Sequence, residues 1–81
     1  MRPIHAIARE IVQDWRKPYF GAVPYIRAMS TINAIEDNYG ADSAQSIVAY
    51  FLANAGAWRG ETARRIKKEL NMMIKRGGQN E

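Results

Sequence analysis

An uncharged run in the middle of the chain constrains the fold more than any other feature. Residues 46–57 read SIVAYFLANAGA, and at helical spacing the run and its first neighbours form one broad apolar face: Ala44, Ile47, Val48, Phe51, Leu52 and Ala55. Ala49 and Ala53 fall on the opposite side and are also apolar. Because a helix that is apolar almost all round is typical of a buried position, the pattern predicts a central helix over about residues 43–55.

Three further segments have the apolar spacing of helices and are expected to pack around the central one: residues 3–16, 24–38 and 61–75. Their inner faces are expected to hold, in that order, Ile4, Ile7, Ala8, Ile11, Val12 and Trp15; Tyr25, Ala28, Met29, Ile32, Ile35 and Tyr39; and Ala63, Ile66, Leu70, Met73 and Ile74. Pro3 and Pro24 stand at the first turn of two of them, where a missing N–H costs nothing. Gly40 is expected to end the second helix in a left-handed conformation. Asp42, followed three residues later by Gln45, predicts a capping box at the start of the central helix.

The length of the chain and the absence of a strand pattern complete the fold prediction. A chain of 81 residues is expected to form one domain. It has no cysteine, so its stability must come from packing. The sequence therefore predicts an all-α fold, a compact bundle of four helices around the central apolar helix. We expect a single helical domain over residues 1–76 and a frayed tail over residues 77–81.

Large aromatic residues outside the predicted helices are expected to cover the ends of the core. Tyr19 and Phe20 lie in the connection KPYFGAV and are expected to fold beneath the core. Trp58 lies in the turn after the central helix and is expected to pack its ring into the core. Each ring would otherwise leave a large apolar area in water.

The far side of the central helix leaves two alternatives open. The bundle surrounds Ala49, Tyr50 and Ala53, or these residues are exposed and form a surface for self-association. Small residues beside one aromatic residue permit the close approach of two helices, so the second alternative predicts a homodimer. The apolar character of the helix favours burial.

The positive charge of the chain is concentrated at its C-terminal end. The net charge is +4, and residues 1–58 hold five basic and five acidic residues, so the whole excess lies in residues 59–81. At helical spacing Arg64, Lys68 and Lys75 share the face opposite the apolar stripe. This asymmetry predicts a partner-binding surface with these members: Trp58, Arg59, Arg64, Arg65, Lys67, Lys68, Lys75 and Arg76. The alternative is a solvated face that only keeps a small protein soluble.

The chain offers little chemistry for catalysis. His5 is the only histidine, and Glu36 and Asp37 are neighbours on a predicted helix and do not face each other. Metal ligation needs clustered histidines, cysteines or carboxylates. We therefore predict that the chain is not an enzyme and binds no cofactor or metal. A helix-turn-helix fits poorly, because the spacing from the turn glycines would place Arg65 or Glu69 in the core.

The uncharged run also bears on membrane association. It is too short to cross a bilayer, which needs about 20 apolar residues. Residues 1–3 lead into a charged amphipathic segment rather than an apolar signal sequence. We expect a soluble, cytoplasmic protein without a membrane partner.

Three stretches of the chain carry a further signal. They are IAREIVQDW at residues 7–15, FGAVPYIRAM at residues 20–29 and YGADSAQSIVAYFLANAGAWRGETARRIKKEL at residues 39–70. Through them the chain resembles small helical proteins that are encoded by bacteriophages, prophages and related mobile elements, and the resemblance covers nearly the whole chain. Such proteins have no assigned activity, so the resemblance transfers no catalytic or binding residue. It implies an accessory protein in the cytoplasm of a bacterial host.

The composition and the resemblance together lead to three functional hypotheses. The first is a non-catalytic protein that binds a larger host or phage protein and modulates or inhibits a host system, such as a defence nuclease. The second is a nucleic-acid-binding protein that uses the basic C-terminal helix. The third is a structural component of a phage assembly.

Overall fold

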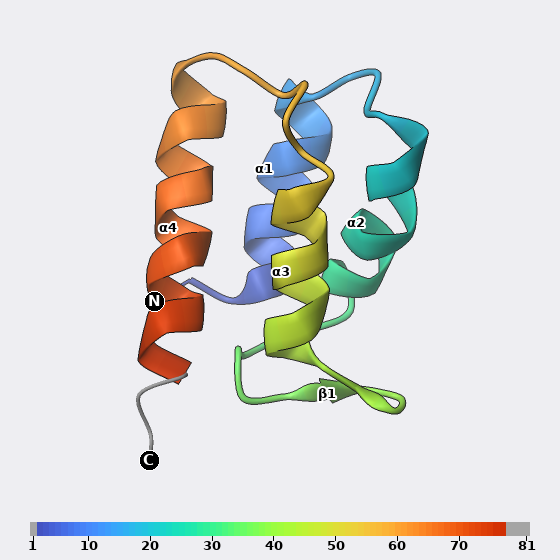
Figure 1. Ribbon diagram of the computed structural model, residues 1–81, viewed down its shortest axis with the longest axis vertical. Coiled ribbons are helices and arrows are strands. Elements are labelled where there is room, and N and C mark those ends of the chain that lie inside the picture. The colour runs from blue at the N-terminus through green and yellow to red at the C-terminus, as the bar shows by residue number, and fades with distance from the viewer. Residues whose placement is uncertain (1, 78–81) are drawn as a thin grey trace.

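Four α-helices dominate the computed structural model, which describes residues 2–77 (Figure 1). Their bounds are α1 Ile4–Asp14, α2 Val23–Met29, α3 Ala44–Ala53 and α4 Glu61–Gly77. The remaining elements are a 3₁₀ turn, η1 (Phe20–Ala22), and a two-stranded hairpin, β1 (Asn38–Tyr39) and β2 (Asp42–Ser43). The prediction of four helices is confirmed. The hairpin is a departure from the all-α prediction.

The helices form a four-sided bundle rather than a ring around one central helix. α1 and α3 each pack against both α2 and α4, so the apolar core lies between the four helices (Figure 1). The prediction that α3 is buried on nearly all sides is wrong, because Ala49, Tyr50 and Ala53 are exposed. Only one face of α3 is buried, through Ala44, Ile47, Val48 and Phe51.

Three aromatic rings close one end of the core. Trp15, directly after α1, stacks on Trp58 of the α3–α4 connection with the ring centroids 5.7 Å apart. Phe51 of α3 meets the two indoles edge-on, with centroid distances of 6.4 and 6.2 Å. Trp58 is only 2% exposed, so the prediction that its ring packs into the core is confirmed. The cluster fixes the C-terminal end of α1 against the α3–α4 connection.

α2 is much shorter than predicted, because its last turn is capped by side chains. The hydroxyls of Ser30 and Thr31 donate hydrogen bonds to the carbonyl oxygens of Ile26 and Ala28, respectively, with an O···O distance of 2.9 Å in each case. Such side-chain bonds offer the backbone an alternative to the helical ladder. The helix therefore ends at Met29 rather than at residue 38.

The segment after α2 supplies hydrogen-bond acceptors to the start of α1, which a longer α2 could not do. The amides of Ile4 and His5 donate to the carbonyl oxygens of Asn33 and Ile32, with N···O distances of 2.9 and 2.8 Å. Helix starts need such acceptors for their free N–H groups. Ile32 and Ile35 are buried as predicted, but they reach the core from an irregular segment.

The hairpin occupies residues that the sequence assigned to the end of the second helix. Asn38 pairs with Ser43, and Tyr39 pairs with Asp42, in antiparallel register. Gly40 has a φ of 62°, the predicted left-handed conformation, but it serves the hairpin turn rather than a helix end. Tyr39 points to solvent, so its predicted place on the inner face of a helix is wrong.

The cap of α3 differs from the prediction by one residue. Ser43, not Asp42, is the N-cap: its Oγ accepts a hydrogen bond from the amide of Ser46 over 3.1 Å. Asp42 is held in the hairpin instead. Gln45, the expected partner in a capping box, donates from Nε2 to the carbonyl oxygen of Ile74 over 3.2 Å. This bond ties the start of α3 to the last turns of α4.

Tyr19 and Phe20 do not fold beneath the core, contrary to the prediction. Phe20 is 80% exposed, and its ring packs against that of Tyr19 with centroids 4.9 Å apart. At Gly21 a Cβ would stand 2.5 Å from Tyr19 Cε2, so glycine allows this ring to lie close against the turn. The connection that carries this pair and the α3–α4 connection lie at the same end of the bundle (Figure 1), and the stacked rings of Trp15 and Trp58 already pack there. Val12, predicted on the inner face of the first helix, is also exposed.

The start of α1 and the end of α4 lie close to the predicted helix ends. α1 begins one residue later than expected, with Pro3 as its N-cap. α4 includes Gly77, the first residue of the predicted tail, and residues 78–81 lie outside the described residues. None of the described helices combines the length and apolar character that crossing a membrane requires.

Candidate functional site

α4 carries a row of exposed cations at the predicted positions. The helix packs on the core through its apolar stripe, as expected: Ala63, Ile66, Leu70 and Met73. On the opposite side Arg64, Lys68 and Lys75 are exposed. Arg59, in the connection before α4, and Arg76, near the end of α4, are exposed as well. We call these five residues the basic face.

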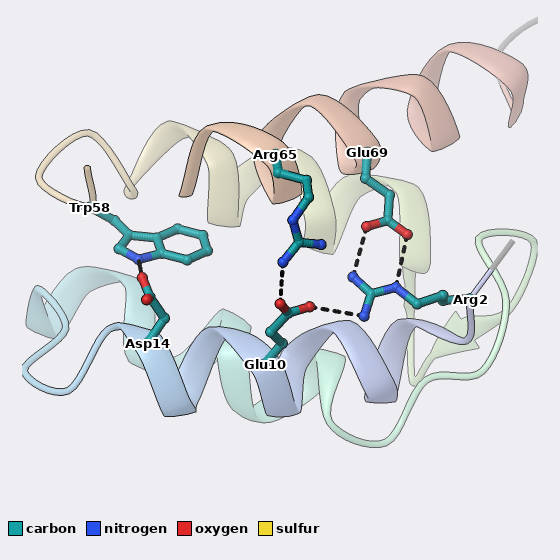
Figure 2. A network of polar contacts seen from close by, with 6 residues as sticks. All are labelled: Arg2, Glu10, Asp14, Trp58, Arg65 and Glu69. Carbon is teal, nitrogen blue, oxygen red and sulfur yellow. Dashed lines mark hydrogen bonds and ion pairs between the residues drawn. The ribbon is translucent and has the colours of Figure 1, made fainter. Parts of the chain in front are cut away.

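Arg65 is not part of the basic face, because it belongs to an ion-pair network between α1 and α4 (Figure 2). Its guanidinium donates to Glu10 Oε2. Arg2 bridges the same carboxylate, at 2.9 Å, to Glu69, whose two oxygens accept from Arg2 Nε and Nη2 at 3.1 and 2.8 Å. The predicted partner-binding residue Arg65 therefore already has an internal partner.

The network also sets the charge states of its members. The hydrogen bond from Arg65 is the largest influence lowering the pKa of Glu10; burial opposes it and the hydrogen bond from Arg2 adds to it. The hydrogen bond to Glu69 is the main cause that raises the pKa of Arg2. Both shifts favour the charged forms of Glu10 and Arg2. This flank of α4 is thus electrostatically satisfied within the chain.

Trp58 supports the surface from beneath and does not present its ring on it. Its indole N–H donates to Asp14 Oδ2 over 2.8 Å (Figure 2). Its carbonyl oxygen accepts a hydrogen bond from Lys67 Nζ over 2.7 Å. The same ammonium lies 5.9 Å from the centroid of the indole, within the range of a cation–π contact. Trp58 and Lys67, which were both predicted to bind a partner, therefore contact each other within the chain.

A hollow of about 390 Å³ lies between the α3–α4 connection and the first turns of α4. We call it the basic hollow, and its lining residues are Gly56, Trp58, Arg59, Gly60, Ala63, Arg64 and Lys67. Its lining contains three cations and no acidic residue. Burial, and secondly the charge of Arg59, lower the pKa of Lys67. The two flanks of α4 are therefore opposite in character: ion pairs face α1, and uncompensated cations face the connection.

Aromatic rings line the seam between α2 and α3, where Tyr25 is half-buried against the core and Tyr50 is exposed. Tyr25 of α2 and Tyr50 of α3 contact each other with ring centroids 5.6 Å apart. The side-chain amide of Asn54 donates to the carbonyl oxygen of Tyr50. The position of Gly21 lies close to the same asparagine, which brings the Tyr19–Phe20 pair near this seam. For Tyr19 and Phe20, the proline and glycine that flank them in KPYFG, which are typical of a surface turn, were the indication in the sequence that their rings lie outside the core.

Residues with the potential for metal or acid–base chemistry are dispersed. The described residues contain no group of three or more histidine, aspartate or glutamate side chains that could hold a metal. Asp37 Oδ2 accepts a hydrogen bond from the amide of Ala34 and thereby fixes a turn. His5 is half-buried at the start of α1.

No family model, no curated protein and no solved structure matches this chain.

Proposed function

We propose that this chain is a non-catalytic binding protein that docks through its basic face onto an acidic surface of a larger protein. One observation carries the proposal. The five cations of the basic face are exposed and make no ion pair with a carboxylate of residues 2–77. Arg2 and Arg65, on the other flank of α4, are both paired. Among residues 2–77, the carboxylates that form ion pairs, Glu10 and Glu69, are both at the other flank of α4.

The scaffold behind the basic face favours a docking role. α4 is held on one side by its apolar stripe, on a second by the network with α1, and near its end by the bond from Gln45 to Ile74. A cationic surface on a fixed helix loses little conformational freedom on binding. Complementary charge also accelerates the encounter with an acidic partner.

The biological setting of the proposal comes from the resemblance to phage-encoded proteins. In that setting, docking would modulate or inhibit a host system, for example a defence nuclease. The resemblance is the support for this part, and the exposed charge is the support for the docking itself.

A capture experiment with two matched variants tests the proposal. The double substitution Lys68→Glu and Lys75→Glu reverses the charge at two of the five positions of the basic face. Arg9→Glu with Arg27→Glu makes the same change in net charge at two exposed positions of α1 and α2. We expect the wild type and the control variant to capture the same bacterial protein from nuclease-treated lysate, and the first variant to lose it. Equal capture by all three folded proteins would exclude the basic face as the docking surface.

A second candidate function is nucleic-acid binding through the same face. The favouring observation is the straight row from Arg64 to Lys75, which spans about 16 Å at about 1.5 Å per residue. A row of three to five phosphate contacts predicts a slope of about −3 to −4.5 in a plot of log affinity against log salt. A flat response, or no binding of an oligonucleotide at low salt, would remove this candidate.

A further inference from the structure

The basic hollow brings together cations from two segments. Arg59 comes from the α3–α4 connection, while Arg64 and Lys67 come from consecutive turns of α4. Residues three apart on a helix are neighbours on its surface, so Arg64 and Lys67 stand side by side. Trp58 and Ala63, both buried, form the floor of the hollow.

The charges in the hollow repel one another, and nothing in its lining compensates them. Lys67 uses one N–H on the carbonyl oxygen of Trp58, a neutral acceptor, which leaves two donors for another group. The nearest acidic residue along α4 is Glu61, which lines a neighbouring depression together with Arg64 and Lys68 but forms an ion pair with neither among residues 2–77. Glu10 and Glu69 are held by Arg2 and Arg65 on the other flank of the helix. Holding three cations together in this way favours an external anion.

The rim of the hollow is open where a ligand would enter. Gly56 and Gly60 contribute no side chain, and a Cβ at either position would meet no atom within 4 Å. Gly60 has a φ of 112°, which other residues rarely adopt, whereas Gly56 has no such restriction. Gly56 is therefore a position where a side chain can be added at the rim without strain.

We propose that the basic hollow binds one terminal phosphate group, either free phosphate or the phosphate monoester of a phosphorylated side chain. A terminal phosphate carries about −1.5 to −2 charges near pH 7 and three acceptor oxygens. Two guanidinium groups and one ammonium are enough to neutralise that charge and supply one cationic group for each of the three acceptor oxygens, and arginine binds phosphate oxygens in a fork. A phosphodiester in a nucleic-acid backbone has a single charge and continues on both sides, which fits a three-cation hollow less well.

The free-phosphate form of the proposal stands independently of the docking function. The form with a phosphorylated side chain rests on it, because the hollow shares Arg59 and Arg64 with the basic face. In that form the hollow would bind the phosphate group of a phosphoserine or phosphothreonine on the protein partner.

Substitutions at Gly56 test the hollow without removing any of its cations. Gly56→Glu places a carboxylate at the rim, where it competes with the ligand for the cations. Gly56→Gln adds nearly the same volume without charge and is the matched control. We expect Gly56→Glu to weaken phosphate binding by about tenfold or more, equivalent to the loss of one charge-assisted contact, and Gly56→Gln to change it by less than about twofold.

The measurement is a titration followed by NMR, with inorganic phosphate as the probe and chloride at equal ionic strength as the reference. We expect saturable shifts at the amides of Gly56, Gly60 and Arg64 and a rise in the pKa of Lys67 as phosphate binds. A phosphoserine peptide and its unphosphorylated form then separate the sources. Stronger binding of the phosphopeptide indicates a partner-borne group, and equal binding of free phosphate indicates a small ligand.

Three results would overturn the proposal. One is a set of non-saturable shifts spread over the whole basic face, and another is equal binding by Gly56→Glu and Gly56→Gln. The third is binding of an oligonucleotide, but not of phosphate or the phosphopeptide, at the hollow. Lys68 and Lys75 do not line the hollow, so the capture experiment with their variants can succeed or fail separately from this titration.

Discussion

Replacing Asp14 with alanine removes the acceptor of the Trp58 indole N–H and is expected to lower the free energy of unfolding by about 1–2 kcal/mol. A hydrogen bond to a charged group contributes about 1.5–3 kcal/mol. The N···O distance is 2.8 Å and Trp58 is 2% exposed, but Asp14 itself is exposed, so water partly replaces the lost carboxylate and the expected cost lies at the low end of that range. The substitution also removes a negative charge from the last residue of α1, where it opposes the helix dipole, which returns about 0.3–1 kcal/mol.

A double-mutant cycle with Trp58→Phe isolates this contact. Urea unfolding of the wild type, Asp14→Ala, Trp58→Phe and the double variant gives the coupling free energy between the two residues. We expect a coupling of about 1–2 kcal/mol, and a loss of about 4–8 °C in the melting temperature for each kcal/mol. Asp42→Ala, at an exposed aspartate in the hairpin, is the control and is expected to change stability by less than about 0.5 kcal/mol.

Two outcomes would refute this reasoning. Asp14→Ala could cost the same in the presence and in the absence of the Trp58 indole N–H, which would mean that the bond contributes nothing. Alternatively, Asp14→Ala could be as harmless as Asp42→Ala. In either case the C-terminal end of α1 would be held against the α3–α4 connection by ring packing alone.

Two further predictions concern the core and the ion-pair network. Phe51→Ala is expected to cost about 3–5 kcal/mol, a large part of the stability of a domain this small, whereas Phe20→Ala is expected to change it by less than about 0.5 kcal/mol; urea unfolding measures both. The pKa of Glu10 is lowered in the folded state, so its stabilising contribution is present above the ordinary value of 4.5 and is lost as the pH falls through the folded pKa. Glu10→Gln should therefore be less stable than the wild type at neutral pH, and the difference should vanish in acid. A difference that is independent of pH would contradict the assignment of Arg65 and Arg2 as ion-pair partners of Glu10.

Local spacing was sufficient to predict most of the helices. The apolar stripe of α4 and the exposure of Arg64, Lys68 and Lys75 follow from one helical period, because every third or fourth residue faces the same way. The buried face of α3, with Ile47 and Phe51, follows from the same rule.

Spacing could not identify the partners of the charged residues. Arg64 and Arg65 are adjacent and chemically identical, yet Arg64 is part of the basic face and Arg65 is paired with Glu10, 55 residues away. Trp58 was assigned to the partner-binding surface, but it lies beneath it, bonded to Asp14, 44 residues away. Contacts between residues so far apart in the sequence depend on how α1 and α4 pack.

The amino-acid sequence by itself determined the helical character of the chain, the apolar faces and the concentration of positive charge in the last segment. These are properties of spacing and composition, which each segment carries alone. Only the tertiary structure decided that the segment after α2 supplies the carbonyl oxygens that satisfy the start of α1. It also decided that one flank of α4 is neutralised by α1 while the other encloses a hollow with three cations. The reason is physical: a polar group is satisfied by whatever packing brings near it, and packing joins residues that the sequence keeps apart.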